Sequence, residues 1–404
     1  MQYTLEELCH KGDMDNIHLI GASSGFSKSG AVYWPKRPCD EKGYMDSIEQ
    51  MFVRTAEIDR RKTLCVECLA LGMWIGGMQI AAALRNIALS GKYHFTICTP
   101  GLDLKAAVHV ITDYHQYYDQ VLVITNPSNI PLVTALFKQK GGSLPMGIIT
   151  LPVVGEYFSE AFREQVGRQY GHPSDAPYVV WTGYGSADTG DLGMETSATM
   201  ALRKFFHRHP DECMGMFGTS SAPMILAASP SAYIEIIDGS IVVTKNQFLP
   251  LVRYNTKDSG GLLSKKRVRE LVPAALYDEL PEEMLYVYGR VDNAVVFYGT
   301  NLMVNDIQDY LLSLPAGMGY GGLFTIHADE SGEVPTFHFT IYTMAEHAGE
   351  EVYQDHLIRF LCNNSAEFNI KYQNLSASCP HPLITLSTDD ISHAAGQTKH
   401  RFIV

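Results

Sequence analysis

The stretch TLCVECLALGMWIGGMQIAAALRN, residues 63–86, decides the fold class of this chain. It is the most apolar part of the sequence and nearly reaches the length of a membrane span, but Glu67, Gln79 and a cluster of glycines interrupt it. We therefore predict a buried strand over residues 63–70, a glycine turn and a helix over about residues 75–90. A strand, a turn and a helix in this order form the repeating unit of α/β proteins.

The same alternation continues on both sides of this stretch. Further strands are predicted at residues 17–22, 94–98, 120–125, 146–154 and 178–182. Helices are predicted at residues 45–60, 104–115, 130–139, 157–169 and 196–207. Strands that alternate with helices predict mainly parallel sheets covered by helices on both faces.

The pattern changes after about residue 222. The runs YIEIID and SIVVT, separated by Gly239, predict an antiparallel hairpin and hence a small β subdomain. A last segment, from about residue 293, holds the strands LFTIH and TFHFTIY around a helix near residues 350–362. This segment is a candidate for a separate α+β domain.

The chain has 404 residues, of which 46% are hydrophobic and 19% charged, as in a globular protein of two or three domains. We predict an α/β fold: a large N-terminal domain of mainly parallel sheets plus the small β subdomain, followed by a small mobile α+β C-terminal domain. The predicted bounds are residues 1–289 for the large domain, 290–292 for a hinge and 293–404 for the C-terminal domain.

Charge and cysteine content exclude several classes of protein. The net charge of -13 argues against binding to nucleic-acid phosphates. Eight cysteines at irregular spacing indicate reduced thiols of a cytoplasmic protein rather than a disulfide framework. Cys65 and Cys68 form a C-x-x-C, but no second ligand pair lies at zinc spacing, so we interpret them as buried thiols. The N-terminal residues lack a secretory signal pattern, and we expect no contact with a membrane.

Two glycine-rich segments follow predicted strands. In ASSGFSKSG, residues 22–30, small residues leave backbone N–H groups able to face an anion; a plain surface turn is the alternative. In WTGYGSADTG, residues 181–190, Tyr184 can stack on a base and Asp188 can hold a magnesium ion. The alternative is a turn with a core tyrosine and a helix-capping aspartate. Ligands of parallel sheets collect at such strand ends, which favours a site.

Two further segments carry arginine and aspartate. FLPLVRYNTKDSG, residues 248–260, presents Asp258, whose ionised carboxylate suits the paired hydroxyls of a ribose. YGRVDN, residues 288–293, places Arg290 and Asp292 where the composition shifts between domains, which is a reasonable position for a hinge.

Taken in chain order, these four segments resemble the adenylate-forming superfamily, most closely its phenylacetate-CoA ligase-like branch. That family has a Ser/Thr/Gly loop, a Y-G-x-[ST]-E segment, an R-Y-x-T-x-D segment and a G-R-x-D hinge in this order. The matching residues here are Ser23-Ser24-Gly25, Tyr184-Gly185-Ser186-Ala187-Asp188, Arg253-Tyr254-Asn255-Thr256-Lys257-Asp258 and Gly289-Arg290-Val291-Asp292. The similarity extends from about residue 4 to the end of the chain.

The resemblance implies a role for each matching residue in the binding of ATP. Tyr184, with Gly185 and Ser186, would pack on adenine, and Asp188 would take the place of the metal-binding glutamate. Asp258 would hold the ribose hydroxyls with help from Arg290, and the Ser23-Ser24-Gly25 loop would hold the phosphates. Two more segments resemble the family: Gly155-Glu156 resembles a turn beside the nucleotide, and Lys399, in GQTKHRFIV, resembles the catalytic lysine. Asp292 would be the pivot of the C-terminal domain.

The chain departs from the family in four places. Phe26 and Lys28 replace a threonine and a glycine of the phosphate loop, and Asp188 is one methylene shorter than glutamate. Gln397 and Thr398 separate the C-terminal glycine from Lys399. Only 22 residues precede the phosphate loop, where the family has several dozen.

The implied function is ATP- and Mg²⁺-dependent activation of a carboxylic acid as an acyl-adenylate, with transfer to a thiol such as coenzyme A. One alternative is a biosynthetic enzyme that passes the activated acid to an amine, a carrier protein or a reductase. A second is a non-catalytic nucleotide-binding relative. The aromatic residues Trp74 and Trp181 suit an aromatic acid, although core packing explains aromatic residues more often than ligand contact does. Relatives are often homodimers; the acid, the acceptor and the oligomeric state cannot be inferred from the residues.

Overall fold

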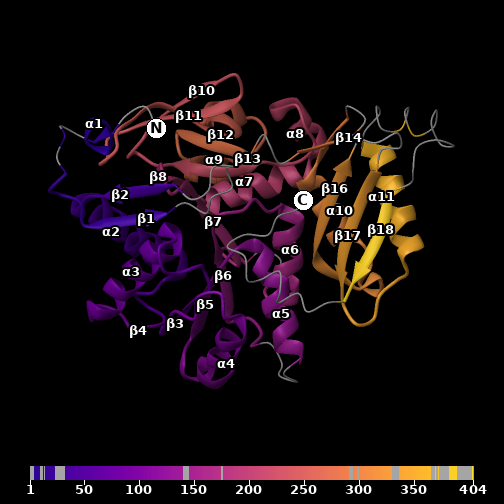
Figure 1. Ribbon diagram of the computed structural model, residues 1–404, viewed down its shortest axis with the longest axis horizontal. Helices are drawn as coiled ribbons and strands as arrows, with labels where there is room; N and C mark the ends of the chain where they lie inside the picture. Colours follow the sequence, from indigo (N-terminus) through magenta and orange to yellow (C-terminus); the bar gives the residue numbers. More distant parts are fainter. Residues whose placement is uncertain are drawn as a thin grey trace. The chain divides into compact units, whose positions relative to one another are not determined.

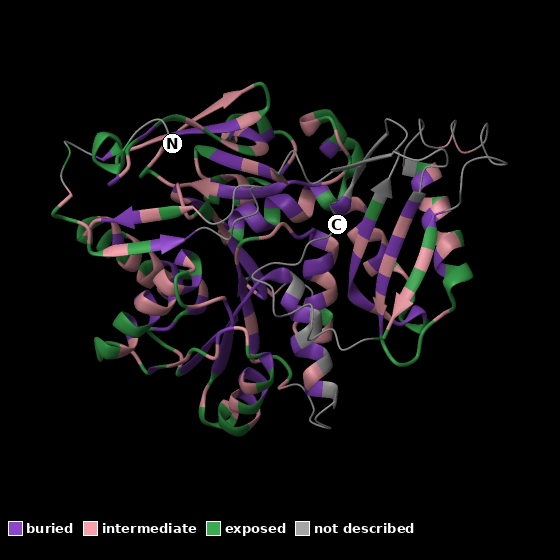
Figure 2. Ribbon diagram, in the orientation of Figure 1, coloured by how far each residue is buried: buried purple, intermediate pink, exposed green. Residues whose placement is uncertain are grey.

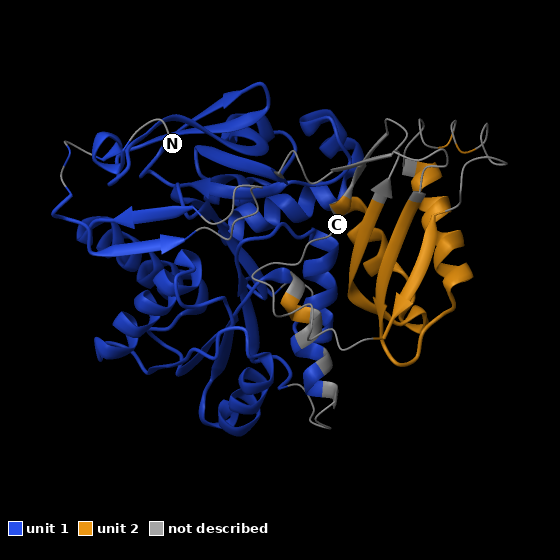
Figure 3. Cartoon of the chain, in the orientation of Figure 1, with its two compact units in different colours: residues 1–127, 133–289 blue, residues 128–132, 290–404 orange. Residues whose placement is uncertain are grey.

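The computed structural model divides the chain into two compact units (Figures 1 and 3). Unit 1 comprises residues 1–127 and 133–289, and unit 2 comprises residues 128–132 and 290–404. The structure describes the chain except for residues 1–3, 10, 11, 13, 23–31, 140–144, 174, 175, 291–293, 298, 299, 330–335, 365–368, 370, 371, 373–381, 389–402 and 404. The hinge predicted at residues 290–292 falls largely outside the described residues and stays a prediction.

One 11-stranded sheet forms the centre of unit 1, in the order β10-β11-β12-β13-β9-β8-β7-β6-β5-β3-β4. Its parallel part consists of β3 (Thr63–Glu67), β4 (Phe95–Cys98), β5 (Gln120–Ile124), β6 (Ile149–Val153) and β7 (Val180–Ser186). The other strands are β8 (Gly190–Met194), β9 (Met224–Ala228), β10 (Tyr233–Ile237), β11 (Ser240–Lys245), β12 (Leu251–Ser264) and β13 (Glu283–Arg290). Pairing turns antiparallel from β7 to β8 onward.

Helices connect the parallel strands, as the sequence pattern predicts. The helices up to residue 289 are α1 (Leu5–Leu8), α2 (Pro38–Ala56), α3 (Ile75–Leu89), α4 (Leu104–Tyr114), α5 (Ile130–Gln139), α6 (Glu160–Gln169), α7 (Ser197–Arg208), α8 (Pro210–Phe217) and α9 (Ala274–Glu279). All belong to unit 1 except the first three residues of α5, 130–132, which belong to unit 2. Four of them begin at side chains that accept a backbone N–H of the first turn: Thr4 for α1, Asp103 for α4, Ser159 for α6 and Thr196 for α7.

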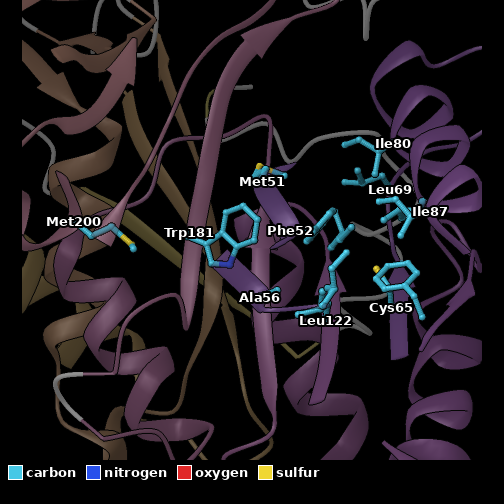
Figure 4. Close-up of a cluster of buried hydrophobic side chains, with 14 residues drawn as sticks. Met51, Phe52, Ala56, Cys65, Leu69, Ile80, Ile87, Leu122, Trp181 and Met200 are labelled. Carbon is cyan, nitrogen blue, oxygen red and sulfur yellow. The ribbon is translucent and has the colours of Figure 1, made fainter. Parts of the chain in front are cut away.

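The core between the sheet and the helices α2 and α3 is continuous and apolar. Phe52 of α2 packs edge-on against Trp181 of β7, with ring centroids 5.8 Å apart (Figure 4). The strands β3 and β5 are buried along their whole length (Figure 2). This burial explains why both read as short apolar runs in the sequence.

A hairpin of β1 (Leu19–Ala22) and β2 (Tyr33–Lys36) docks on the start of α3. The backbone N–H of Ala22 donates to the carbonyl of Met73 at 2.7 Å. A Cβ at Gly21 would lie 2.6 Å from the Cβ of Ile75, so the close approach requires glycine there or a shift of Ile75. The segment after Ala22 therefore begins beside the N-terminus of α3.

Unit 2 has its own sheet and its own core. It contains β14 (Ala294–Phe297), β15 (Thr300–Met303), α10 (Val304–Ser313), β16 (Tyr320–Asp329), β17 (Thr336–Thr343), α11 (Glu350–Asn364) and β18 (Leu383–Ser387). The strands β16, β17 and β18 form one sheet, in which β18 is parallel to β17. Its aromatic core includes Phe324, Phe337, Phe339 and Tyr353.

The predicted α/β fold class is confirmed, with one difference. The hairpin predicted for the small β subdomain, β10–β11, does form, and it extends the same sheet as the parallel strands. Among the elements that the sequence pattern missed are β8 and α8, which are too short to show a clear periodicity. Among the described residues, no helix combines the length and the apolar character that a membrane span requires.

Candidate functional site

The turn between β7 and β8 carries most of the second motif. Gly185 pairs with Asp191, and Ser186 pairs with Gly190. A Cβ at Gly185 would lie 2.2 Å from the carbonyl oxygen of Gly190, so any other residue would force the two strands apart. The tight pairing explains why a glycine follows the aromatic residue at this position.

Tyr184 and Asp258 meet although 74 residues separate them. The Tyr184 hydroxyl donates to Oδ2 of Asp258 at 2.6 Å. Burial raises the pKa of Tyr184, and the charge of Asp258 raises it further, so the phenol stays protonated and remains a donor. Two of the residues that the motifs assign to one nucleotide are therefore in contact.

The strand β12 presents Asp258 through irregular backbone. Arg253 and Lys257 both have positive φ, at 50° and 62°, which is uncommon for residues other than glycine. The pairing of β12 with β11 shifts register near both positions, as in β-bulges, which bend a strand and redirect its side chains. The Asp258 backbone N–H donates to the Thr256 hydroxyl at 3.1 Å and closes this bend.

Asp188 lies at the tip of the β7–β8 turn and is held there. Its carboxylate accepts from the Ser186 hydroxyl and from the Thr189 backbone N–H, the latter at 3.1 Å. Its carbonyl accepts from Nε2 of Gln247 at 2.6 Å. This single, half-buried carboxylate fits a magnesium ion, which usually takes one or two protein carboxylates and completes its shell with phosphate and water.

Two lysines that sequence reasoning missed, one buried and one half-buried, lie in the electrostatic environment of this turn. Lys36 of β2 is only 6% exposed; burial lowers its pKa, while the charges of Asp40 and Asp188 raise it. Lys245 of β11 donates to the carbonyl of Asp191 at 3.0 Å, and burial lowers its pKa too. Neither lysine belongs to a motif, so only the tertiary structure reveals them.

The start of α2 holds the segment that leads into β12. The Asp40 carboxylate accepts from the Phe248 backbone N–H at 3.2 Å and from Nη2 of Arg37 at 2.9 Å. Burial alone would raise the pKa of Asp40, but these donors and the Arg37 charge lower it overall. The hydrogen bond from Phe248 to Asp40 links the start of α2, which follows the β1–β2 hairpin, to the residues just before β12, the strand that carries Asp258.

Gly155 and Glu156 follow β6 directly, one strand away from β7. Gly155 has a φ of +84°, in the left-handed region that favours glycine. Next to it, Nδ2 of Asn126 donates to the carbonyl of Val154 at 2.8 Å and joins the ends of β5 and β6. The predicted turn therefore lies at the same edge of the sheet as the start of the β7–β8 turn.

The remaining predicted site residues lie outside what the structure describes. These are Ser23, Ser24, Gly25, Asp292 and Lys399, together with the side chain of Arg290, whose backbone ends β13. Their roles stay predictions.

The C-x-x-C is a pair of buried thiols, as predicted. Cys65 and Cys68 are both 0% exposed, and burial raises the pKa of each thiol well above its ordinary value. Thiols that stay protonated are poor metal ligands. Among the described residues, no group of three or more His, Cys, Asp or Glu side chains is arranged to hold a metal.

No family model and no curated protein matches this chain, whereas many solved structures do. A 2-hydroxyisobutyryl-CoA ligase in the postadenylation state, in complex with 2-HIB-AMP, matches with a TM-score of 0.63 at 13% identity, covering 96% of this chain and 74% of that chain. An acyl acid amido synthetase in complex with 2,4-DB matches with a TM-score of 0.56 at 10% identity, covering 96% and 80%. The adenylation, ketoreductase and pseudo Asub multidomain structure of a keto acid-selecting NRPS module matches with a TM-score of 0.53 at 12% identity, covering 95% and 32%. The chain therefore has the fold of the adenylate-forming enzymes, as its motifs predicted.

Proposed function

We propose that this protein is an adenylate-forming ligase of the phenylacetate-CoA ligase-like kind, which activates a carboxylic acid with ATP and passes the acyl group to a thiol such as coenzyme A. The observation that carries the proposal is the contact of Tyr184 with Asp258 at 2.6 Å, at the end of the parallel sheet. The two residues come from separate motifs, and a single nucleotide that contacts both would explain why the two motifs meet at this place.

In this proposal the nucleotide lies along the ends of β6 and β7. Tyr184 packs on adenine beside the Gly185-Ser186 backbone and the Gly155-Glu156 turn. Asp258 accepts from the ribose hydroxyls, and Tyr184 holds its carboxylate in place. Arg290 assists at the ribose.

The acid carboxylate attacks the α-phosphorus of ATP; an O–P bond forms, and the bond to the β-phosphate oxygen breaks, with pyrophosphate leaving. Because two anions must approach, positive charge is needed at the reacting phosphate. The backbone N–H groups of Ser23, Ser24 and Gly25 and the Lys399 ammonium supply it. A magnesium ion held by Asp188 would neutralise phosphate charge. Each such group typically contributes a few kcal/mol.

In the second step, the acceptor attacks the acyl carbon and AMP leaves. Rotation about Asp292 moves Lys399 away and opens a path for this acceptor. The amido synthetase with the same fold favours a second candidate, in which an amine replaces the thiol. A homodimer stays a prediction that no described contact addresses.

Exchange of labelled pyrophosphate into ATP, measured with a panel of carboxylic acids, tests the proposal. Acid-dependent exchange is expected, and added coenzyme A should yield a thioester that hydroxylamine cleaves. Exchange without a thioester, together with amide formation from an added amine, would favour the second candidate. No exchange with any acid, combined with ATP binding by calorimetry, would indicate a non-catalytic nucleotide-binding protein instead.

A further inference from the structure

Lys36 is a buried lysine without a partner. It ends β2, is 6% exposed, and forms no hydrogen bond or ion pair with any residue that the structure describes. Lysine is almost never buried unless it is paired, because its ammonium group loses hydration on burial. Neither the sequence motifs nor the proposed reaction uses Lys36. Its burial therefore needs a separate explanation.

A second lysine approaches Lys36 from another strand. Burial lowers the pKa of Lys36, and the charge of Lys245 on β11 lowers it further. The Lys245 ammonium group lies against the β7–β8 turn, where it donates to the Asp191 carbonyl at 3.0 Å. This hydrogen bond uses one of its three donors. Two like charges that converge from separate strands repel each other, so an anion that contacts both would stabilise the pair.

The carboxylates around the two lysines have other partners. Asp40 pairs with Arg37 at 2.9 Å, and Asp188 accepts from groups of its own turn. Burial raises the pKa of Asp191, so this carboxyl group is charged less readily than an ordinary aspartate. None of the three aspartates forms an ion pair with either lysine; their charges act on the lysines only from a distance.

A phosphate group fits this arrangement best. It carries up to two negative charges and has several acceptor oxygens, so it can accept from both ammonium groups at once. Lysine binds phosphate as a point charge and needs no planar partner. A neutral ligand would leave both charges uncompensated, and a carboxylate would supply only one negative charge.

We propose that Lys36 and Lys245 form a binding site for a phosphate group beside the β7–β8 turn. The phosphate belongs either to the polyphosphate of a bound nucleotide or to a separate phosphorylated ligand, since both offer the same chemistry. In either case the anion joins β2 to β11 and pairs the ammonium group of Lys36. The site is inferred from these contacts alone and does not require the proposed reaction.

Calorimetry with inorganic pyrophosphate tests the site and needs no turnover. Lys36→Met replaces the ammonium group by an apolar chain of similar shape. We expect it to weaken pyrophosphate binding by roughly 10- to 100-fold, the usual effect of losing a hydrogen bond between charged groups. Lys36→Arg keeps the charge and should bind more tightly than Lys36→Met. Lys92→Met is the matched control, because it removes the same charge from a side chain that is 60% exposed.

Two results would overturn the inference. One is that the unaltered protein does not bind pyrophosphate. The other is that Lys36→Met binds it as tightly as Lys92→Met does.

The melting temperature of the ligand-free protein separates this role from a structural one. Lys36→Met should raise it, because the substitution removes a buried charge that has no partner. A lysine that only supports the fold, through its attraction to Asp40 and Asp188, would give a lower melting temperature and an unchanged affinity for pyrophosphate. Should Lys36→Met lower both, the affinity is measured again in Lys245→Met, at a half-buried position. An unchanged affinity in that variant would overturn the inference.

Competition identifies the source of the phosphate, and either source supports the site. If a nucleotide supplies it, ATP displaces pyrophosphate, and Lys36→Met weakens the binding of ATP but not that of adenosine. If a separate ligand supplies it, pyrophosphate and ATP bind together with independent affinities. Absence of acid-dependent exchange alongside Lys36-dependent pyrophosphate binding would reject the proposed function and keep this inference. Exchange with equal pyrophosphate affinity in Lys36→Met would do the reverse.

Discussion

At the scale of single residues, the half-buried Tyr184 and the buried Glu67 differ in their hydrogen bonding. Tyr184 has its partner in Asp258, whereas Glu67 has none among the described residues. A paired group adds modestly to stability and fixes geometry, whereas an unpaired buried one lowers stability. Removing each side chain should therefore have different consequences for activity and for stability.

Tyr184→Phe removes only the hydroxyl that donates to Asp258. We expect the KM for ATP in the exchange assay to rise roughly 10-fold, because a hydrogen bond to a charged group contributes about 1.5–3 kcal/mol. Tyr233→Phe, on the exposed side of β10, is the control and should behave as the unaltered protein. An unchanged KM in Tyr184→Phe would argue against a role of the pair in nucleotide binding.

Glu67 also makes stability depend on pH. Its pKa rises from an ordinary 4.5 to about 8 on folding, so between these values the unfolded chain loses a proton that the folded chain keeps. The protonated Glu67 side chain therefore contributes fully to the free energy of unfolding below pH 4.5. This contribution is lost as pH rises toward 8, by up to about 1.4 kcal/mol per pH unit. Glu67→Gln should remove this loss. Urea unfolding of both proteins at several pH values measures it, and parallel pH profiles would contradict the assignment.

At the scale of elements, the β7–β8 turn depends on a glycine. Gly185→Ala would place its Cβ 2.2 Å from a carbonyl oxygen of β8. We expect the hairpin to distort, the melting temperature to fall and acid-dependent exchange to be lost. Gly215→Ala is the matched control: Gly215 lies inside α8 and its Cβ would meet nothing within 4 Å, so helix propensity should make it neutral or stabilising. Equal effects of both substitutions would refute the steric explanation.

A buried ion network joins α6, α7 and the end of β8. Glu195 and Arg203 are both 0% exposed; Glu195 accepts from Nη2 of Arg163 at 2.5 Å and from the Thr182 backbone N–H at 3.0 Å. Glu195→Gln should destabilise unit 1 by about 3–5 kcal/mol, because it leaves buried arginine charge uncompensated. Urea unfolding measures this. Arg60→Ala breaks an exposed pair with Glu57 and should change stability by less than about 1 kcal/mol.

At the scale of the whole molecule, the proposed reaction needs both units. Residues 1–289 hold Tyr184, Asp188 and Asp258, while Lys399 belongs to the C-terminal part of the chain. Lys399→Ala should abolish formation of the acyl-adenylate but spare transfer from supplied acyl-AMP to the acceptor, because only the first step requires its ammonium group. Single-turnover assays of the two half-reactions measure this separately. Equal loss of both half-reactions would contradict the assignment of Lys399 to the first step alone.

Most of the fold was predictable because its signals are local. Short apolar runs mark β3 and β5, apolar residues at helical spacing mark α3 and α4, and α4 also starts at the capping residue Asp103. The parallel part therefore follows from neighbouring residues alone. The β10–β11 hairpin turns at Asp238 and Gly239, which both have positive φ. The motifs likewise located Tyr184 and Asp258 as site candidates.

The amino-acid sequence by itself determined the order and type of these elements, since backbone and side-chain periodicity act within a few residues. Only the tertiary structure decided which distant groups meet. It brought Tyr184 to Asp258 and placed the buried Lys36 and the half-buried Lys245 near the Asp188 turn. It left Glu67, at the end of its strand, without a hydrogen-bond partner among the described residues. Contacts of this kind depend on how strands register across the sheet, and no local pattern encodes that register.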